Sequence, residues 1–148
     1  MKKAAALFLT LACLTALTAC RSMGGANINS AGTVIEMQMD KNYDDADPFV
    51  NERLFCVSED MAALTVKVNA EVSGEKGVLM IKNNKTNEVL WSGAAWEGPG
   101  RAESFSISLE GLKRGEEYAV CFTGTKIDYA AIELAFESSL VQERERPL

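Results

Sequence analysis

The stretch Leu64-Thr-Val-Lys-Val-Asn-Ala-Glu-Val72 alternates strictly between apolar and polar residues. Successive side chains of a β-strand point to opposite faces, so this alternation is typical of a strand with one buried face and one wet face. The same period of two recurs at residues 35–39 and 105–109. Strands of parallel sheets are buried on both faces and do not alternate in this way. We therefore expect an antiparallel β-protein.

Further runs rich in β-branched and aromatic residues extend this pattern along most of the chain. About eight short strands are expected, at residues 35–39, 53–57, 64–72, 78–82, 88–92, 105–109, 118–122 and 130–136. Turn-forming residues separate several of them, at 73–77, 83–87 and 111–115. Regular spacing without a strong helical segment predicts an all-β fold, an antiparallel β-sandwich of jelly-roll or immunoglobulin-like type. A small closed barrel is the alternative.

The segment Gly111-Leu-Lys-Arg-Gly-Glu-Glu-Tyr-Ala-Val-Cys-Phe122 resembles the GLxxGxxYxVxV segment of fibronectin type III domains. The resemblance implies that Leu112 packs beneath a turn and that Tyr118 opens the next strand as a corner. It covers about a dozen residues, so it bears on architecture alone. Cys121 comes three residues after Tyr118, which places it on the opposite face of the strand from Tyr118, Val120 and Phe122.

The chain begins Met1-Lys-Lys3 and continues with an uncharged apolar run to Leu17. A short basic start, an apolar run of about 14 residues and small residues before a break are typical of a secretory signal peptide. A membrane-spanning helix needs about 20 apolar residues, which this run does not reach. We therefore expect residues 1–19 to be a cleaved leader.

The leader ends in Leu17-Thr-Ala-Cys20, which resembles the lipobox of bacterial lipoproteins. That resemblance implies that the Cys20 thiol carries a diacylglycerol and that the new terminal amine is acylated, giving the several acyl chains that stable anchoring needs. Arg21, rather than Asp, follows the cysteine, which favours the periplasmic face of the outer membrane. Residues 20–32 would then be the lipidated cysteine and a flexible tether that holds the domain about 20 Å from the membrane.

The resemblance to lipoproteins changes the reading of the four cysteines. Cys13 leaves with the leader and Cys20 carries lipid, so Cys56 and Cys121 remain. In an oxidising envelope compartment two remaining cysteines are most simply one disulfide. Two independent buried thiols are the alternative.

The charge balance limits the partners. Removing Lys2 and Lys3 with the leader leaves 13 basic and 21 acidic residues, a net charge of −8. Such a chain is repelled by nucleic acid and by anionic surfaces, so no nucleic-acid partner is expected. The chain contains no histidine, no nucleophile elbow and no phosphate-binding loop. We therefore expect no enzymatic activity and no cofactor.

An acidic stretch at residues 40–48 begins like a calcium loop, with Asp40, Asn42 and Asp44 alternating. An EF-hand also needs Gly at its sixth position and Glu at its twelfth, which are Asp45 and Asn51 here. A different calcium site, made by Asp44, Asp45 and Asp47, is the weaker hypothesis. A solvated loop between two strands is the stronger one, and no metal is expected.

Both tryptophans flank a connection rich in Gly and Pro. Exposed rings of Trp91 and Trp96 could stack on sugars as in carbohydrate-binding modules, although both could instead pack against the protein. Residues 33–137 are thus expected to form the sandwich, and 138–148 a charged tail that is frayed or contacts a partner. Three functions follow: an envelope module that contacts another protein, a module that binds carbohydrate or peptidoglycan, or an inhibitor of an envelope-directed hydrolase.

Overall fold

A computed structural model describes residues 32–42 and 48–145. In these ranges the chain forms β-strands and no helix, and all pairings between strands are antiparallel. The six strands are β1 (Val34–Asp40), β2 (Phe49–Val57), β3 (Met61–Asn83), β4 (Val89–Leu112), β5 (Glu117–Phe136) and β6 (Val141–Arg144). Within the described ranges, no helix is long and apolar enough to cross a membrane. The expected all-β, antiparallel fold is confirmed.

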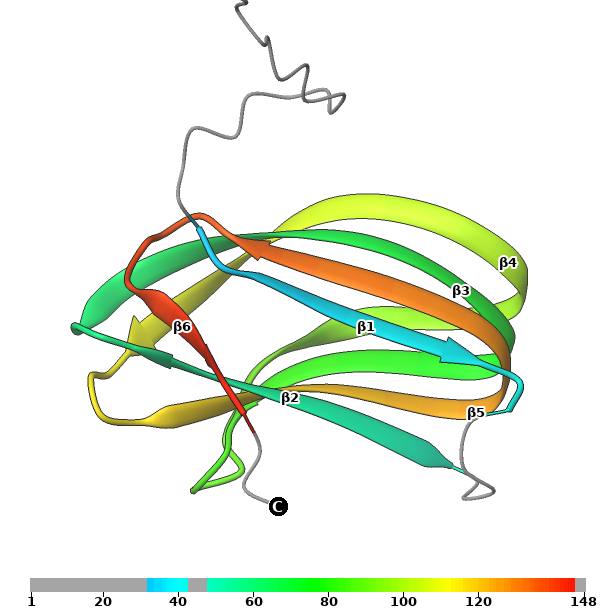
Figure 1. Ribbon diagram of the computed structural model, residues 1–148, viewed down its shortest axis with the longest axis horizontal. Helices are drawn as coiled ribbons and strands as arrows, with labels where there is room; N and C mark the ends of the chain where they lie inside the picture. Colours follow the sequence, from blue (N-terminus) through cyan, green and yellow to red (C-terminus); the bar gives the residue numbers. More distant parts are fainter. Residues whose placement is uncertain (1–31, 43–47, 146–148) are drawn as a thin grey trace, which may run out of the picture.

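Three of the strands are long and bend, so that each contributes to two facing layers (Figure 1). Their order in the sheet is β4-β3-β5-β2-β6, and β1 pairs with the far half of β5. We call the layer around β1 the β1 layer; it contains β1 and residues 129–136, 64–73 and 101–112. The β2 layer contains β2, β6 and residues 117–125, 76–83 and 89–98.

All eight strands expected from the sequence overlap observed strands, with Glu88 just outside β4, but three pairs of them are continuous. The predicted turn at 73–77 is wrong, because β3 runs through it with shifts of register at Gly74 and Gly77. A side chain at Gly74 would meet the Lys126 carbonyl oxygen at 2.6 Å. Glycine therefore permits a close approach of two bending strands here rather than a reversal of the chain.

The core lies between the two layers and is built by the alternating residues. Leu64, Val66, Val68 and Val72 are all buried, as the alternation predicts. Phe55 stacks on Tyr118 with ring centroids 5.3 Å apart. One buried cluster joins residues of both layers, and it includes Ile35, Met37, Leu79, Ile81, Leu109, Phe122, Leu134 and Phe136. Burying this many apolar side chains is the main stabilising contribution to the fold.

The predicted tail contains a strand. Val141 is buried and begins β6, which pairs with residues 54–57 of β2. The Thr33 hydroxyl donates to the Val141 carbonyl oxygen at 2.6 Å, which ties the start of the domain to its end. The expectation of a frayed tail from residue 138 is therefore wrong for residues 141–144.

Two turns meet at one end of the molecule. Asn83 is the buried polar residue there, and its Oδ1 accepts hydrogen bonds from the backbone amides of Lys85 and Thr86 at 2.9 and 3.0 Å. Its Nδ2 donates to Glu116 Oε2 at 3.0 Å. The Tyr118 hydroxyl donates to the same oxygen at 3.1 Å. Glu116 thus joins the 83–88 turn to the 111–116 turn.

Leu112 and Tyr118 hold the turn that precedes β5. Leu112 is fully buried, and the Tyr118 hydroxyl accepts a hydrogen bond from the Lys113 backbone amide at 2.7 Å. Burial is the largest influence on this hydroxyl and raises its pKa above 10.0; the bond from Lys113 acts in the opposite direction. This tyrosine therefore closes the turn that precedes β5.

The predicted disulfide between Cys56 and Cys121 is absent from the structure. Cys56 lies opposite Glu117, whereas Cys121 lies opposite Glu52, so the two cysteines are four register positions apart. Four positions span about 13 Å along a strand. A disulfide needs Cα atoms within about 7 Å, so this register excludes the bond.

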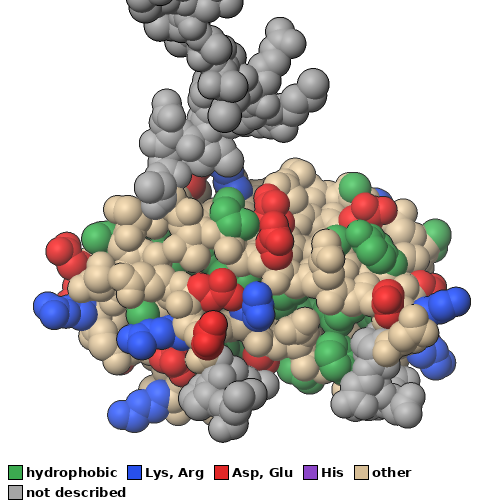
Figure 2. Space-filling view, in the orientation of Figure 1, with side chains coloured by type: hydrophobic (Ala, Val, Ile, Leu, Met, Phe, Trp, Pro, Cys, Tyr) green, Lys and Arg blue, Asp and Glu red, His purple; other side chains and the backbone are tan. Residues whose placement is uncertain are grey.

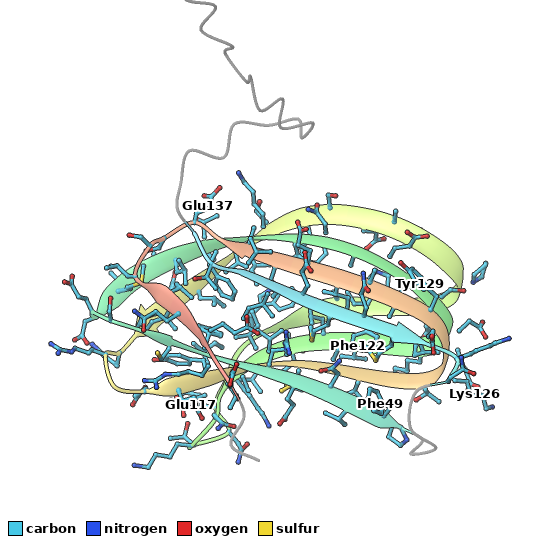
Figure 3. The ribbon with its side chains drawn as sticks, viewed as in Figure 1. Phe49, Glu117, Phe122, Lys126, Tyr129 and Glu137 are labelled. Atoms are coloured by element: carbon cyan, nitrogen blue, oxygen red, sulfur yellow. The ribbon has the colours of Figure 1, made fainter. Side chains whose placement is uncertain are left out.

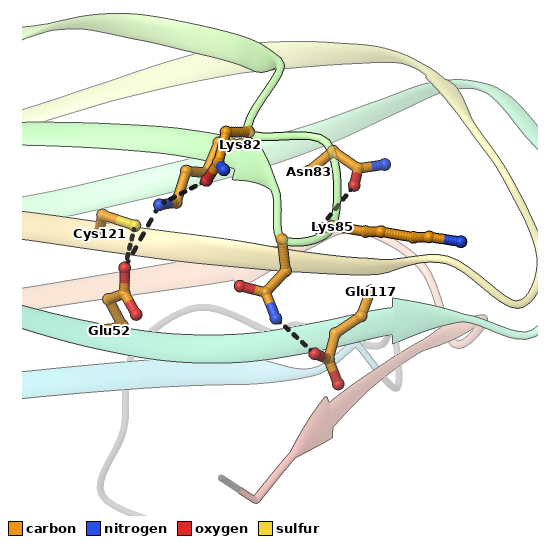
Figure 4. A network of polar contacts seen from close by, with 8 residues as sticks. Glu52, Lys82, Asn83, Lys85, Glu117 and Cys121 are labelled. Atoms are coloured by element: carbon orange, nitrogen blue, oxygen red, sulfur yellow. Dashed lines mark hydrogen bonds and ion pairs between the residues drawn. The ribbon is translucent and has the colours of Figure 1, made fainter.

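The two sulfurs have separate neighbours on the outer side of the β2 layer. Cys121 packs in a small cluster with Leu54 and Ala119, away from the main core, as its offset from Tyr118 predicts. Its thiol donates to Glu52 Oε1 at 3.3 Å, and Figure 4 shows the same carboxylate facing Lys82. Arg144 Nε donates to the Cys56 sulfur at 3.1 Å.

Candidate binding face

The outer side of the β1 layer carries a row of polar side chains that crosses four strands. The register places Glu36 of β1 opposite Glu133 of β5, then Asn69 of β3, then Ser104 of β4. Glu36, Asn69 and Glu133 each stand between two buried apolar residues, so their own side chains point to the outer side of the layer. The row is therefore a direct product of the pattern in the sequence.

Hydrogen bonds order this row. The Ser104 hydroxyl donates to Asn69 Oδ1 at 2.8 Å, and Asn69 Nδ2 donates to Glu133 Oε1 at 3.0 Å. The carboxylate of Glu133 is thus held from one side, while Glu36 faces it from the neighbouring strand. Like charges directly opposite each other in an antiparallel pair destabilise a sheet. The row therefore ends in two acidic groups whose proximity favours a cation.

A shallow depression lies beside the row. The next row consists of Gln38, Ala131, Glu71 and Ala102, and the short side chains of the alanines leave a hollow between longer neighbours. Its volume is about 290 Å³. Figure 2 shows acidic side chains on the surface over β1 and β5. An extended segment with a positively charged group could lie in such a hollow.

Tyr129 flanks the depression on the same face, between Asp40 and Ser73. It is one of the few large apolar side chains that are well exposed, at 42%. Figure 3 places it near the end of the molecule where β5 bends, with Lys126 beyond it. An exposed aromatic ring beside carboxylates suits a cationic group, which can contact both. We call Glu36, Gln38, Asn69, Glu71, Tyr129 and Glu133 together the acidic face.

The tryptophans do not form the predicted stacking platform. Both lie on the inner side of β4, opposite Ile81 and Gly77. Trp96 is buried and its ring lies 6.4 Å from that of Phe122. Trp91 is partly buried and stacks on Phe105 with centroids 6.0 Å apart. The Gly/Pro-rich residues 97–100 that follow Trp96 lie within β4, where the strand bends, and not in a loop between strands.

Several predicted site residues lie outside the described ranges. These are Cys20 and the three weak calcium candidates Asp44, Asp45 and Asp47. Among the residues that the structure describes, no group of three or more acidic or cysteine side chains is arranged to hold a metal ion. Asp40 instead accepts a hydrogen bond from the Asn42 backbone amide at 2.8 Å, which closes a turn after β1.

Sequence reasoning missed the acidic face. The alternation showed that Asn69 and Glu71 are exposed, but it could not show that Glu36 and Glu133 lie beside them. Their proximity depends on pairing between strands that lie far apart in the sequence. Asn69 and Glu133, for example, are 64 positions apart. The only local signal was the polar half of each alternating strand.

The fold and the acidic face together describe an all-β domain with an open polar sheet surface. The chain belongs to the family described as a domain of unknown function, DUF4624, whose model matches residues 21–148. None of the curated proteins compared with the chain matches it.

Two solved structures are similar in part, both of cowpea mosaic virus. One is an empty virus-like particle studied by electron cryo-microscopy, with 10% identity, a TM-score of 0.38 and coverage of 83% of this chain and 88% of that chain. The other is the naturally occurring empty top component, with 9% identity, a TM-score of 0.37 and coverage of 83% and 96%. These scores are too low to support any argument.

Proposed function

We propose that this protein is a lipid-anchored component of the cell envelope whose β-sandwich is a non-catalytic interaction module. The basic start, the apolar run and the Leu17–Cys20 lipobox pattern support the anchor. The family model begins at residue 21, directly after the cysteine that would carry the lipid. In this proposal Cys20 holds the protein at the periplasmic face of the outer membrane, and the acidic face binds the partner.

The proposal for the binding surface rests on Glu36 and Glu133, which lie directly opposite each other on β1 and β5. The pair repels itself in an otherwise well-ordered row, and a bound cationic group would remove that repulsion. Glu71 lines the same depression, and Tyr129 lies on the same face of β5, two positions before Ala131 of the lining. The proposed partner is therefore a basic segment of another envelope protein, whose Lys or Arg side chains bind at the acidic face.

The other two predicted functions have weaker support. Glycan binding through both tryptophans at the surface conflicts with the burial of Trp96. Inhibition of an envelope-directed hydrolase stays a prediction, and a hydrolase with a basic surface near its active site would be one instance of the proposed partner. Neither function needs a cofactor.

The binding surface is tested by capture from solubilised envelope with the full chain in detergent. Replacing Glu36 and Glu71 with Lys reverses charge on the acidic face. The matched control replaces Glu59 and Glu88, which lie in exposed turns away from this face, and changes the net charge equally. We expect the wild type and the control to capture the same protein and the Glu36/Glu71 variant to lose it. Equal capture by all three would contradict the assignment of the face.

The anchor is tested separately by fractionation. Cys20→Ser removes the only thiol at the lipobox, so the variant is expected in the soluble fraction and the wild type in the membrane fraction. Mass spectrometry of the wild-type N-terminal peptide should also show the added acyl chains. Membrane association that is unchanged in Cys20→Ser would refute the lipid anchor without bearing on the acidic face.

A further inference from the structure

The strand β4 is an open edge of the sheet. It is the last strand in the order β4-β3-β5-β2-β6 and, in the part of the chain that the structure describes, it pairs with β3 alone (Figure 1). The backbone N–H and C=O groups that point away from β3 therefore have no neighbouring strand. Such a row of groups is a template to which another strand can be added.

The second arm of β4, residues 101–112, lacks the features that normally protect an edge strand. These features are charged side chains, proline, bulges and a short length. The arm pairs with β3 in one register throughout, without a bulge, and it contains no proline. The exposed side chains in its middle are three serines, Ser104, Ser106 and Ser108. Residues 104–109 therefore form a regular and uncharged edge.

The other edges carry such protection. β1 exposes Glu36 and Asp40, and the part of β2 that β6 leaves uncovered includes Glu52 and Arg53. β6 itself is only four residues long. The first arm of β4 pairs with β3 through shifts of register and leads into Pro99. Among the edges of the described strands, the second arm of β4 is thus the unprotected one.

The core is also incompletely covered along β4. Six partly buried apolar side chains of the described residues pack against the core, and four of them lie on β4: Leu90, Trp91, Ala94 and Phe105. Trp91 of the first arm stacks on Phe105 of the second arm, with ring centroids 6.0 Å apart. The open edge therefore presents partly exposed aromatic surface beside its unpaired backbone groups. A strand added at this edge would cover both.

The charges of the second arm are compatible with pairing to a second copy of itself. In a symmetric antiparallel pair, a two-fold axis perpendicular to the sheet preserves both faces, so opposite residues differ by an even number of positions. Glu103 and Glu110 differ by an odd number and cannot lie opposite each other in such a pair. Arg101 also balances the charge of Glu103 through their ion pair. A register centred on the middle of the arm therefore places no carboxylate opposite another.

We propose that a second copy of this chain extends the sheet by antiparallel pairing of β4 with β4, about a two-fold axis at Ile107. In this register Phe105 lies opposite Leu109 of the second copy, and Ser106 lies opposite its Ser108. Apolar residues then continue the inner face and serines continue the outer face. A two-fold interface uses the same strand of each copy, so one closed dimer covers both unprotected edges. This inference depends neither on the acidic face nor on the lipid anchor.

The test places like charges across the proposed axis. Sedimentation equilibrium of the full chain, in detergent matched in density to the solvent, measures the mass of the protein, and we expect the wild type to be a dimer. Replacing Ser106 and Ser108 with Lys places Lys opposite Lys, and replacing both with Glu places Glu opposite Glu. Each variant should self-associate about tenfold more weakly or worse. An equimolar mixture of the two variants should form the dimer again, because each Lys then lies opposite a Glu.

The matched control replaces Ala63 and Thr65 with Lys. Both residues are exposed on the same face, opposite Glu110 and Ser108, but they lie on β3, one strand in from the edge. The control carries the same added charge as the lysine variant and should dimerise as the wild type does. Circular dichroism of each variant alone checks that it is folded, so that loss of the dimer is not mistaken for loss of the fold.

Three results would overturn the proposal. The first is a wild type that remains a monomer at every concentration. The second is a dimer that survives in both the lysine and the glutamate variants, since it would then use another surface. The third is a mixture of the two folded variants that does not recover the dimer. A monomeric wild type whose lysine variant loses a captured protein would show that the edge pairs with a foreign strand instead. Loss of capture by the Glu36/Glu71 variant bears only on the acidic face.

Discussion

Replacing Asn83 tests how the two turns at one end of the domain are held together. Asn83 makes three side-chain hydrogen bonds, two as an acceptor from the 83–88 turn and one as a donor to Glu116. A net contribution of about 1 kcal/mol for each bond gives a cost of about 3 kcal/mol for Asn83→Ala. For a domain of this size the melting temperature should fall by about 10 °C.

Asn83→Asp is the sharper change because it keeps the two accepting interactions. It replaces the Nδ2 donor with a carboxylate oxygen. In the wild type Nδ2 lies 3.0 Å from Glu116 Oε2, so the new oxygen would lie close to that carboxylate. The lost bond and the new repulsion should together cost about 2–4 kcal/mol at neutral pH. Acidification should recover part of this loss, because one of the two carboxylates then takes up a proton.

A second substitution checks the origin of that cost. Glu116→Gln in the Asn83→Asp background supplies an amide that can donate to the new carboxylate, so it should restore about 2 kcal/mol. In the wild-type background the same change should cost less than about 1 kcal/mol, since the Gln oxygen can still accept from Asn83 and Tyr118. The assay is urea unfolding followed by circular dichroism, as a double-mutant cycle. Additive effects of the two substitutions would refute the direct contact.

Three further predictions address features that the sequence alone placed differently or left open. Cys56 and Cys121 should both be free thiols that react with a thiol reagent only after the protein is unfolded, with no reductant added. A disulfide-linked peptide that contains both cysteines would show that the β2–β5 register is wrong. Tyr118→Phe should cost about 1–2 kcal/mol at neutral pH. The raised pKa of Tyr118 means that its contribution is complete below pH 10.0 and is lost as pH rises through its folded pKa, so alkaline titration should destabilise the wild type more than the variant. Deleting residues 141–148 should lower the melting temperature, because it removes the buried Val141 and the pairing of β2 with β6; an unchanged value would mean that the tail is dispensable.

Local patterning was enough to predict which residues form strands and which face of each strand is buried. Residues 64–72 follow the alternation throughout, and the 83–87 turn lies where Asn and Lys residues indicate it. The turn at 73–77 was wrong, because Gly and Ser also permit a bend within a continuous strand. A composition rich in small residues does not distinguish a reversal from a bend.

The candidate sites could not be predicted, because they depend on which strands lie side by side. Glu133 becomes part of the acidic face through its pairing with Glu36 and Asn69, and no short stretch of sequence contains that information. The expected disulfide failed for the same reason. Two cysteines and an oxidising compartment make a bond plausible, but the register of β2 against β5 decides whether the sulfurs can meet.

The bends of β3, β4 and β5 have a consequence for how the domain unfolds. Because the backbone of each passes through both layers, neither layer can detach while the other keeps its full set of partners. The domain should therefore behave as one cooperative unit rather than as two stacked sheets with separate stabilities. Amide hydrogens in residues 64–72 and 78–82 would exchange through the same global opening, although they lie in different layers. A destabilising substitution at one edge of the sheet should therefore lower the free energy of unfolding of the whole domain.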